Sequence, residues 1–64
     1  MLYTVPEIAK ILKVYQHKVY KLIEKKILIS LKLGRLKVTR AELSRFLNQY
    51  TGNDLSDLDN IKDL

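Results

Sequence analysis

The sequence predicts a small, mainly helical domain with one β-hairpin, arranged as a winged helix-turn-helix. Residues 3–47 read in order as a short helix, a tight turn, a second helix, a two-stranded ribbon and a third helix. Apolar residues recur every three or four positions in the helical segments and every second position in the ribbon, which are the two periods of helix and strand side chains. The outward positions of the second helix and the ribbon are mostly basic or polar.

The first helix is expected to begin directly after Thr4. Thr4 and Glu7 have the spacing of a capping box, in which each side chain accepts a hydrogen bond from a backbone N–H that lacks a helical partner. Pro6 suits the first turn, because its missing N–H would have had no partner there. The pattern breaks at residues 13–15, which predicts the turn. The side chains expected to face the core are Val5, Ile8, Ala9 and Leu12.

A second helix is expected from about Gln16 to Lys26. Its inward stripe is Val19, Leu22 and Ile23. At about 100° per residue, the opposite side carries hydrogen-bond donors with cations at its margins, as a helix that docks in the major groove of DNA requires. We therefore predict that Gln16, His17 and Lys21 face bases, and that Lys18, Tyr20 and Lys25 face the DNA backbone.

The segment from residue 28 to residue 38 alternates as a ribbon, with Gly34 and Arg35 at its turn. A two-stranded ribbon is unstable alone, so its apolar side chains, beginning with Ile29, Leu31 and Leu33, are expected to pack on the helices. The tip is a candidate wing that places cations against the DNA backbone or minor groove. The predicted wing contacts are Lys32, Arg35 and Lys37.

A third helix is expected to close the core. Thr39 and Glu42 repeat the capping-box spacing of the first helix. The apolar positions that follow recur at helical spacing and predict one buried face. They are Leu43, Phe46, Leu47 and Tyr50.

The formal charge of +5 is divided unevenly along the chain. Residues 1–50 carry eleven Lys or Arg against three Glu, or +8, which suits a DNA-binding domain; residues 51–64 carry one Lys against four Asp, or −3, and form an acidic C-terminal tail. The tail has two interpretations. It is either a flexible end that aids solubility, or an amphipathic segment that docks on a partner or a neighbouring copy. The docking residues would be Leu55, Leu58 and Ile61.

Composition argues against several other classes of protein. The chain has no Cys, no apolar run near the roughly 20 residues of a membrane span, and too few residues to shape a substrate cleft. Its single His, His17, has no sequence partners that would make it a catalytic base or metal ligand. We therefore expect a cytoplasmic protein that is not an enzyme, with no cofactor, metal, small-molecule substrate or membrane partner.

Several segments match a known family in order and spacing: Tyr3-Thr4-Val5 with Glu7-Ile8-Ala9, Val19-Tyr20-Lys21-Leu22-Ile23, Lys32-Leu33-Gly34-Arg35, and Glu42-Leu43 with Phe46-Leu47. In these segments the chain resembles the excisionase-type helix-turn-helix family, relatives of the MerR-like winged DNA-binding domains. The resemblance implies that the second helix enters the major groove and that the wing touches the minor groove or backbone. Two departures stand out. Tyr15 stands where the family has a capping residue such as Ser, and Lys18 stands where it has Thr, with a family Gly near Lys26.

The function predicted from these observations is sequence-specific binding of double-stranded DNA. Two roles remain open. One is an excisionase-like directionality or architectural factor of a mobile element, which would contact an integrase or recombinase, or the next copy on adjacent sites. The other is a small transcriptional repressor of a phage or mobile element. A third interpretation, from a different class, is a protein-interaction adaptor that uses the acidic tail.

Overall fold

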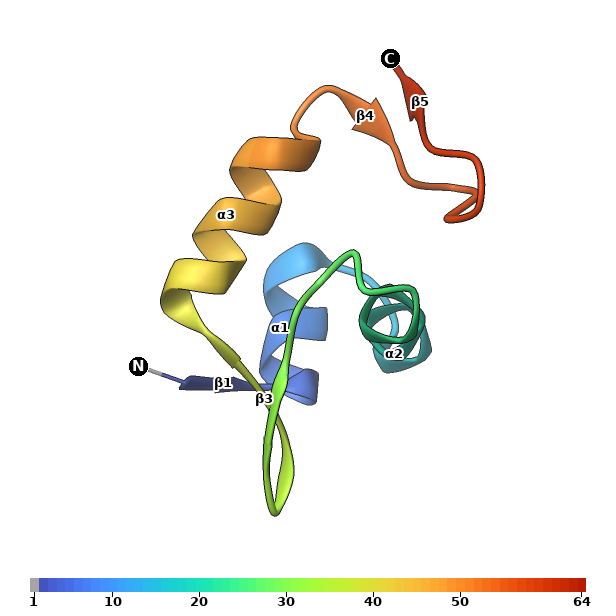
Figure 1. The fold of residues 1–64 in the computed structure, drawn as a ribbon. Helices are drawn as coiled ribbons and strands as arrows, with labels where there is room; N and C mark the ends of the chain where they lie inside the picture. Colours follow the sequence, from blue (N-terminus) through green and yellow to red (C-terminus); the bar gives the residue numbers. More distant parts are fainter. Residues whose placement is uncertain (1) are drawn as a thin grey trace.

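The structure, a computed structural model, describes residues 2–64 and confirms the winged helix-turn-helix (Figure 1). Three α-helices are the main elements of the described chain, and short strands precede, join and follow them. The helices are α1 (Val5–Leu12), α2 (Gln16–Glu24) and α3 (Arg40–Tyr50). The strands are β1 (Leu2–Thr4), β2 (Leu31–Leu33), β3 (Arg35–Thr39), β4 (Asn53–Asp54) and β5 (Lys62–Asp63).

The start of α1 has the predicted capping box. The backbone N–H of Thr4 donates to Glu7 Oε1 at 2.8 Å, and the N–H of Glu7 donates to Thr4 Oγ1 at 3.3 Å. The helix ends at Lys13, whose left-handed φ of 58° turns the chain toward α2. Because the capping spacing and the break in the apolar pattern at residues 13–15 are both local in sequence, this helix could be placed before its packing was known.

The second helix begins at Gln16 as predicted and ends at Glu24, two residues earlier than expected. Lys26, with φ 60°, reverses the chain direction. The chain then enters the core through Ile27 and Leu28, whose backbone N–H groups both donate to the carbonyl of Leu22, at 3.0 and 3.1 Å. The helix ends earlier than expected because Ile27 and Leu28, the two residues after Lys26, leave the helix and fill part of the core.

The predicted two-stranded ribbon is part of a three-stranded antiparallel sheet with the order β1-β3-β2. Strand β1 pairs with β3 from Leu2 opposite Thr39 to Thr4 opposite Lys37. Strand β1 was not predicted, because its three residues stand alone and lack the longer alternation that residues 28–38 show. Its pairing with β3 joins the base of the wing to the start of α1.

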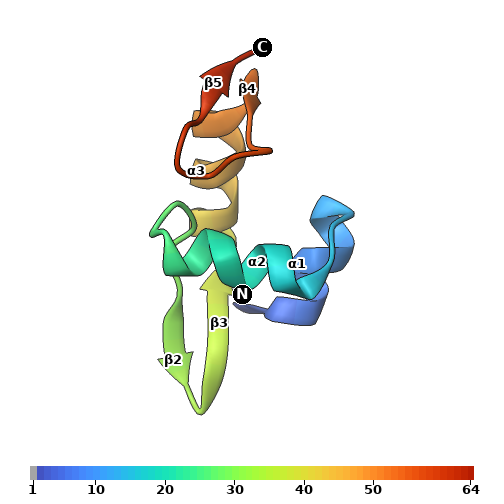
Figure 2. The same ribbon diagram turned by 90° about the vertical axis from the view of Figure 1, so that its right-hand side faces the viewer.

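The expected packing of Ile29, Leu31 and Leu33 on the helices is wrong. Ile29 is 49% exposed and Leu33 is 64% exposed. In the sheet, Leu31 lies opposite Lys37 and Leu33 lies opposite Arg35, so these side chains share one face, while Val38 lies on the other and is fully buried. The hairpin also projects beyond the helices (Figure 2), which leaves its outer face in solvent.

The core lies where the three helices meet β3. Its buried side chains come from every helix and from the segment after α2. Four predicted members are less enclosed than expected, because Leu47 is exposed and Leu12, Ile23 and Tyr50 are half-buried. The buried side chains are Val5, Ile8, Ala9, Val19, Leu22, Ile27, Leu28, Val38, Leu43 and Phe46.

The acidic end of the chain folds back over the domain. Gly52, with φ 91°, turns the chain after α3, and β4 pairs with β5. Leu55, Leu58 and Ile61 pack against the core from the loop between these strands. Figures 1 and 2 both show this loop beside α2.

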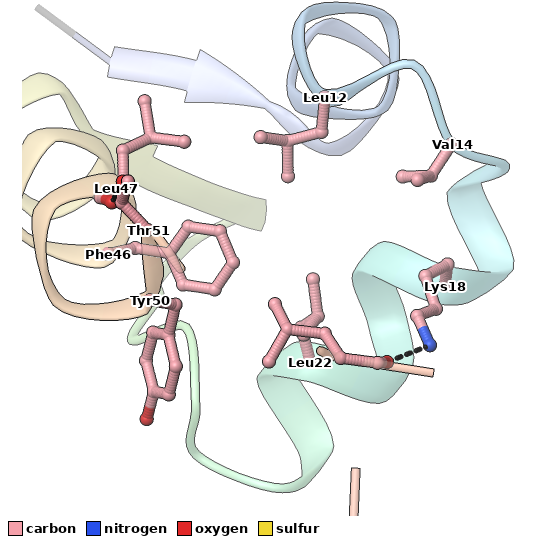
Figure 3. A pocket seen from close by; sticks show the side chains of 9 residues that line it. Leu12, Val14, Lys18, Leu22, Phe46, Leu47, Tyr50 and Thr51 are labelled. Carbon is pink, nitrogen blue, oxygen red and sulfur yellow. Dashed lines mark hydrogen bonds between the residues drawn. The ribbon is translucent and has the colours of Figure 1, made fainter. Parts of the chain in front are cut away.

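An apolar groove of about 270 Å³ remains between the ends of α1, α2 and α3 (Figure 3). Leu12, Phe46 and Tyr50 form much of its wall, and Leu55 reaches it from the tail. The rings of Phe46 and Tyr50 lie 5.4 Å apart between centroids. The groove therefore marks the place where Leu55 of the tail contacts the helical core.

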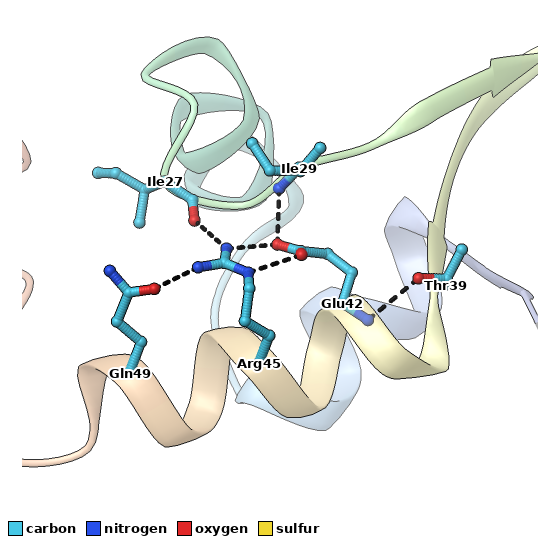
Figure 4. A network of polar contacts seen from close by, with 6 residues as sticks. All are labelled: Ile27, Ile29, Thr39, Glu42, Arg45 and Gln49. Carbon is cyan, nitrogen blue, oxygen red and sulfur yellow. Dashed lines mark hydrogen bonds and ion pairs between the residues drawn. The ribbon is translucent and has the colours of Figure 1, made fainter.

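A polar network connects α3 to the segment after α2 (Figure 4). Arg45 Nε donates to Glu42 Oε1 at 2.7 Å, and Arg45 Nη2 donates to the carbonyl of Ile27 at 3.0 Å. The N–H of Ile29 donates to Glu42 Oε2 at 2.9 Å. The hydrogen bonds from Arg45 lower the pKa of Glu42, and Glu42 in turn raises the pKa of Arg45. The network holds residues 27–29, which lead from α2 into the wing, against α3.

Candidate nucleic-acid interface

The outer side of α2 presents the residues that were predicted to face bases. Gln16, His17 and Lys21 are exposed, while Val19 and Leu22 on the opposite side are buried in the core. Lys21 Nζ lies 3.9 Å from Glu24 Oε2, in a surface pair that contributes little energy and leaves the ammonium accessible. This side of the helix therefore offers donors that can reach base edges.

On one flank of α2, a concave surface between the helix and the wing encloses a volume of about 590 Å³. Gln16 and Tyr20 line it from α2, and Arg35 and Lys37 line it from β3. Its remaining wall comes from Leu36 and from the start of α1. The surface thus brings together four of the predicted DNA contacts, although they lie up to 21 positions apart along the chain.

The three predicted wing cations do not share one face of the sheet. Arg35 lies opposite Leu33 and Lys37 lies opposite Leu31, whereas Lys32 lies opposite Leu36. Cross-strand partners project to the same side, so Lys32 projects away from the other two. Gly34, with φ 74°, forms the turn between them. The tip can accordingly present cations to two sides.

The other flank of α2 is occupied by the tail. Lys18 Nζ donates to the carbonyl of Leu55 at 2.8 Å (Figure 3), and Lys25 Nζ lies 2.7 Å from Asp59 Oδ1. The hydrogen bond that Lys25 donates to Asp59 raises the pKa of Lys25. Two of the three residues predicted to face the DNA backbone, Lys18 and Lys25, therefore contact the tail. The third, Tyr20, lies on the side of α2 that faces the wing.

The tail also reaches the outer face of α2. A hollow of about 350 Å³ is lined by His17, Lys18, Lys21 and Lys25 from the helix and by residues 56–59 from the tail. The position of the tail was not predicted from the sequence. The one signal that pointed toward it is the opposite charge of the two segments, which does not specify where they meet.

Two further classes of feature are not found in residues 2–64. Within this range, no group of three or more His, Cys, Asp or Glu side chains is arranged to hold a metal ion. None of the helices described here is both long and apolar enough to cross a membrane.

A family model described as a helix-turn-helix domain matches residues 2–51. The match spans every element from β1 to α3 and stops before β4. Comparison with curated proteins and with solved structures gave no significant match. The matched family is a DNA-binding family and not an enzyme family. Because most of the chain is matched, the protein belongs to the family of excisionase-like helix-turn-helix domains, which bind DNA.

Proposed function

We propose that the chain binds double-stranded DNA in a sequence-specific manner, with α2 in the major groove and the wing against the neighbouring backbone or minor groove. The observation that carries this proposal is the concave surface between α2 and the wing. Gln16 and Tyr20 form one wall, and Arg35 and Lys37 form the other. A surface of this kind allows one DNA strand to be gripped while the outer side of α2 reads the groove.

Within this arrangement the residues have distinct tasks. Lys21 and His17 would donate to acceptors on base edges, and the amide of Gln16 can both donate and accept. Arg35 and Lys37 would neutralise phosphates, which contributes affinity without distinguishing sequences. Tyr20, half exposed between the two groups, would donate its hydroxyl to a phosphate.

For the biological role we propose an excisionase-like directionality or architectural factor of a mobile element, on the strength of the family to which the chain belongs. Such a factor would occupy adjacent sites and contact an integrase, a recombinase or the next copy. The same DNA surface would serve a small transcriptional repressor. The two roles differ in how their sites are arranged, so the number and spacing of bound sites distinguish them.

The test is selection from a random duplex pool at about 0.15 M salt, which suppresses non-specific backbone binding. We expect a recovered motif; tandem copies filled cooperatively would support the excisionase-like role, and a single operator would support the repressor. Failure to recover any motif would contradict sequence-specific binding.

Two variants test the assigned tasks on the recovered site. Lys21→Ala should relax the preference at one base position, at a cost of about 1–3 kcal/mol, and Arg35→Ala should weaken binding to all sequences and reduce the salt slope by about one unit. The matched control is Lys10→Ala, which removes the same charge from an exposed position of α1 outside the proposed surface. If the chain were a protein-interaction adaptor, all three substitutions would change its affinity for DNA equally little.

A further inference from the structure

We propose that the acidic tail, through its residues 53–63, competes with DNA inside the same molecule, by covering one flank of α2 until a duplex displaces it. This inference rests on the proposed function, because it concerns the regulation of the same surface. It assigns the tail a role in controlling access to α2. It does not require a separate protein partner.

The first argument is the chemistry of the contacts. Asp59 places a carboxylate oxygen 2.7 Å from the ammonium of Lys25, and the carbonyl of Leu55 accepts from Lys18 at 2.8 Å. Carboxylate and carbonyl oxygens here take the donors that phosphate oxygens would take on DNA. Asp57 lies near the same ammonium and contributes to the raised pKa of Lys25. The tail therefore satisfies cations that DNA would otherwise use.

The second argument is space. The major groove of B-form DNA is about 12 Å wide, and a helix with its side chains is about 10–12 Å across. The groove therefore admits α2 but has no room for a further chain segment beside it. Residues 56–59 share a hollow with His17 and Lys21, so they reach the side of α2 that would enter the groove. The tail and the duplex cannot occupy this side together.

The third argument is that the tail has a defined position in the fold but is held on α2 by a weak ion pair, so that DNA can replace it. Its base is closed by the β4–β5 pair and by a hydrogen bond of 2.9 Å from Asn53 Nδ2 to Asp63 Oδ1, and its apolar side chains rest on the core. Lys25 and Asp59 keep 40% and 73% of their side chains exposed. An exposed ion pair is weak and screened by salt, whereas a duplex offers many phosphates at once. DNA can accordingly displace the tail.

The first experiment compares Asp59→Asn with Asp63→Asn in the full chain. Both variants change the net charge by the same amount. Asp59 contacts α2, whereas Asp63 accepts a hydrogen bond from Asn53 that the amide oxygen of an asparagine can still accept. We expect Asp59→Asn to bind a mixed-sequence duplex of about 20 base pairs more tightly than Asp63→Asn, by up to about fivefold. Equal affinities of the two variants would overturn the proposal.

A second comparison leaves the charge unchanged. Leu58→Ser removes an apolar contact that holds the tail on the core, and Leu64→Ser changes a side chain that is 89% exposed. We expect only Leu58→Ser to increase affinity for the same duplex. Tighter binding by neither variant, with both folded by circular dichroism, would contradict the proposal.

A direct measurement follows the tail itself by ¹⁵N relaxation during titration of the wild-type chain with this duplex. We expect the amides of residues 55–61 to become mobile as those of α2 show DNA contact. If α2 responds while residues 55–61 stay rigid and unshifted, the competition is refuted and DNA binding stands. If the duplex does not bind at all, both the proposed function and the competition fail.

Discussion

Tyr15 occupies a capping position that its side chain cannot serve. It is the N-cap of α2, with φ −73° and ψ 152°, and in the described chain its side chain accepts no capping hydrogen bond. Because the side chain is 87% exposed, its replacement loses little packing. Tyr15→Ser is expected to raise the free energy of unfolding by about 1 kcal/mol. Urea denaturation measures this gain, and Tyr15→Ala, which removes the ring without adding an acceptor, should not show it.

Lys26 is held in a backbone conformation that favours glycine. Its φ of 60° is left-handed, and a side chain at such a position costs roughly 1 kcal/mol. Lys26→Gly should therefore stabilise the fold by about 0.5 kcal/mol, once the larger flexibility of unfolded glycine is deducted. Lys26→Ala removes the same charge but keeps the strain, so thermal melting of the two variants isolates the backbone contribution. Equal melting temperatures would contradict this explanation.

At the scale of elements, the Glu42–Arg45 network should make the fold sensitive to acid. The hydrogen bonds of Arg45 lower the pKa of Glu42 in the folded state below its ordinary value of 4.5. The stability from this carboxylate is therefore present above pH 4.5 and is lost as the pH falls through the lower folded pKa.

Glu42→Gln is expected to remove this part of the pH dependence. The variant should be less stable than the wild type at pH 7, and the difference should shrink as the pH falls below 4.5, because protonation then weakens the wild-type network as well. Urea denaturation across this range measures the effect. Glu24→Gln, a change at an exposed residue of α2, is the matched control; an equal shrinkage there would contradict the role of the network.

The helices could be predicted from the sequence because their signals are local. Thr4 with Glu7, and Thr39 with Glu42, indicate two helix starts within four residues each. Only the first pair forms the full capping box, because the carboxylate of Glu42 accepts from Ile29 and Arg45 instead. The sheet could be predicted only in part, because the face that a strand buries depends on its pairing with another strand. A register that sets Leu33 opposite Arg35 turns the apolar side of β2 to solvent, and alternation along β2 does not reveal that choice.

At the scale of the whole molecule, Leu28 is expected to be indispensable. It is fully buried where the segment after α2 enters the core. Leu28→Ala should cost about 2–5 kcal/mol, which is comparable with the total stability of about 3–10 kcal/mol for a domain of this size. Ile29→Ala, one residue further on and 49% exposed, should cost less than about 1 kcal/mol. Circular dichroism on heating distinguishes the two, and similar melting curves would contradict the assigned core.

The outward positions of α2 and the cations of the wing could be predicted from the sequence, but the place of the tail beside α2 could not. A helical projection places Lys21 outward without knowledge of the fold, and the structure agrees. The contact between Lys18 and Leu55 joins residues 37 positions apart, and that between Lys25 and Asp59 is similarly distant. Opposite charges at such separation have many ways to meet, so the place of the tail follows from the folded core and not from the charges.

Strand β2 has a consequence for handling the protein. It forms one edge of the sheet, and its exposed face carries Leu31 and Leu33, so its outer backbone groups could pair with the same strand of another copy. The strand has three residues, with Lys32 at its centre, and each copy carries a net charge of +5. Short length and like charge both oppose such pairing, but charge repulsion is screened by ions. Added salt would therefore weaken DNA binding and, in concentrated stocks, also the repulsion that prevents polymerisation through this edge.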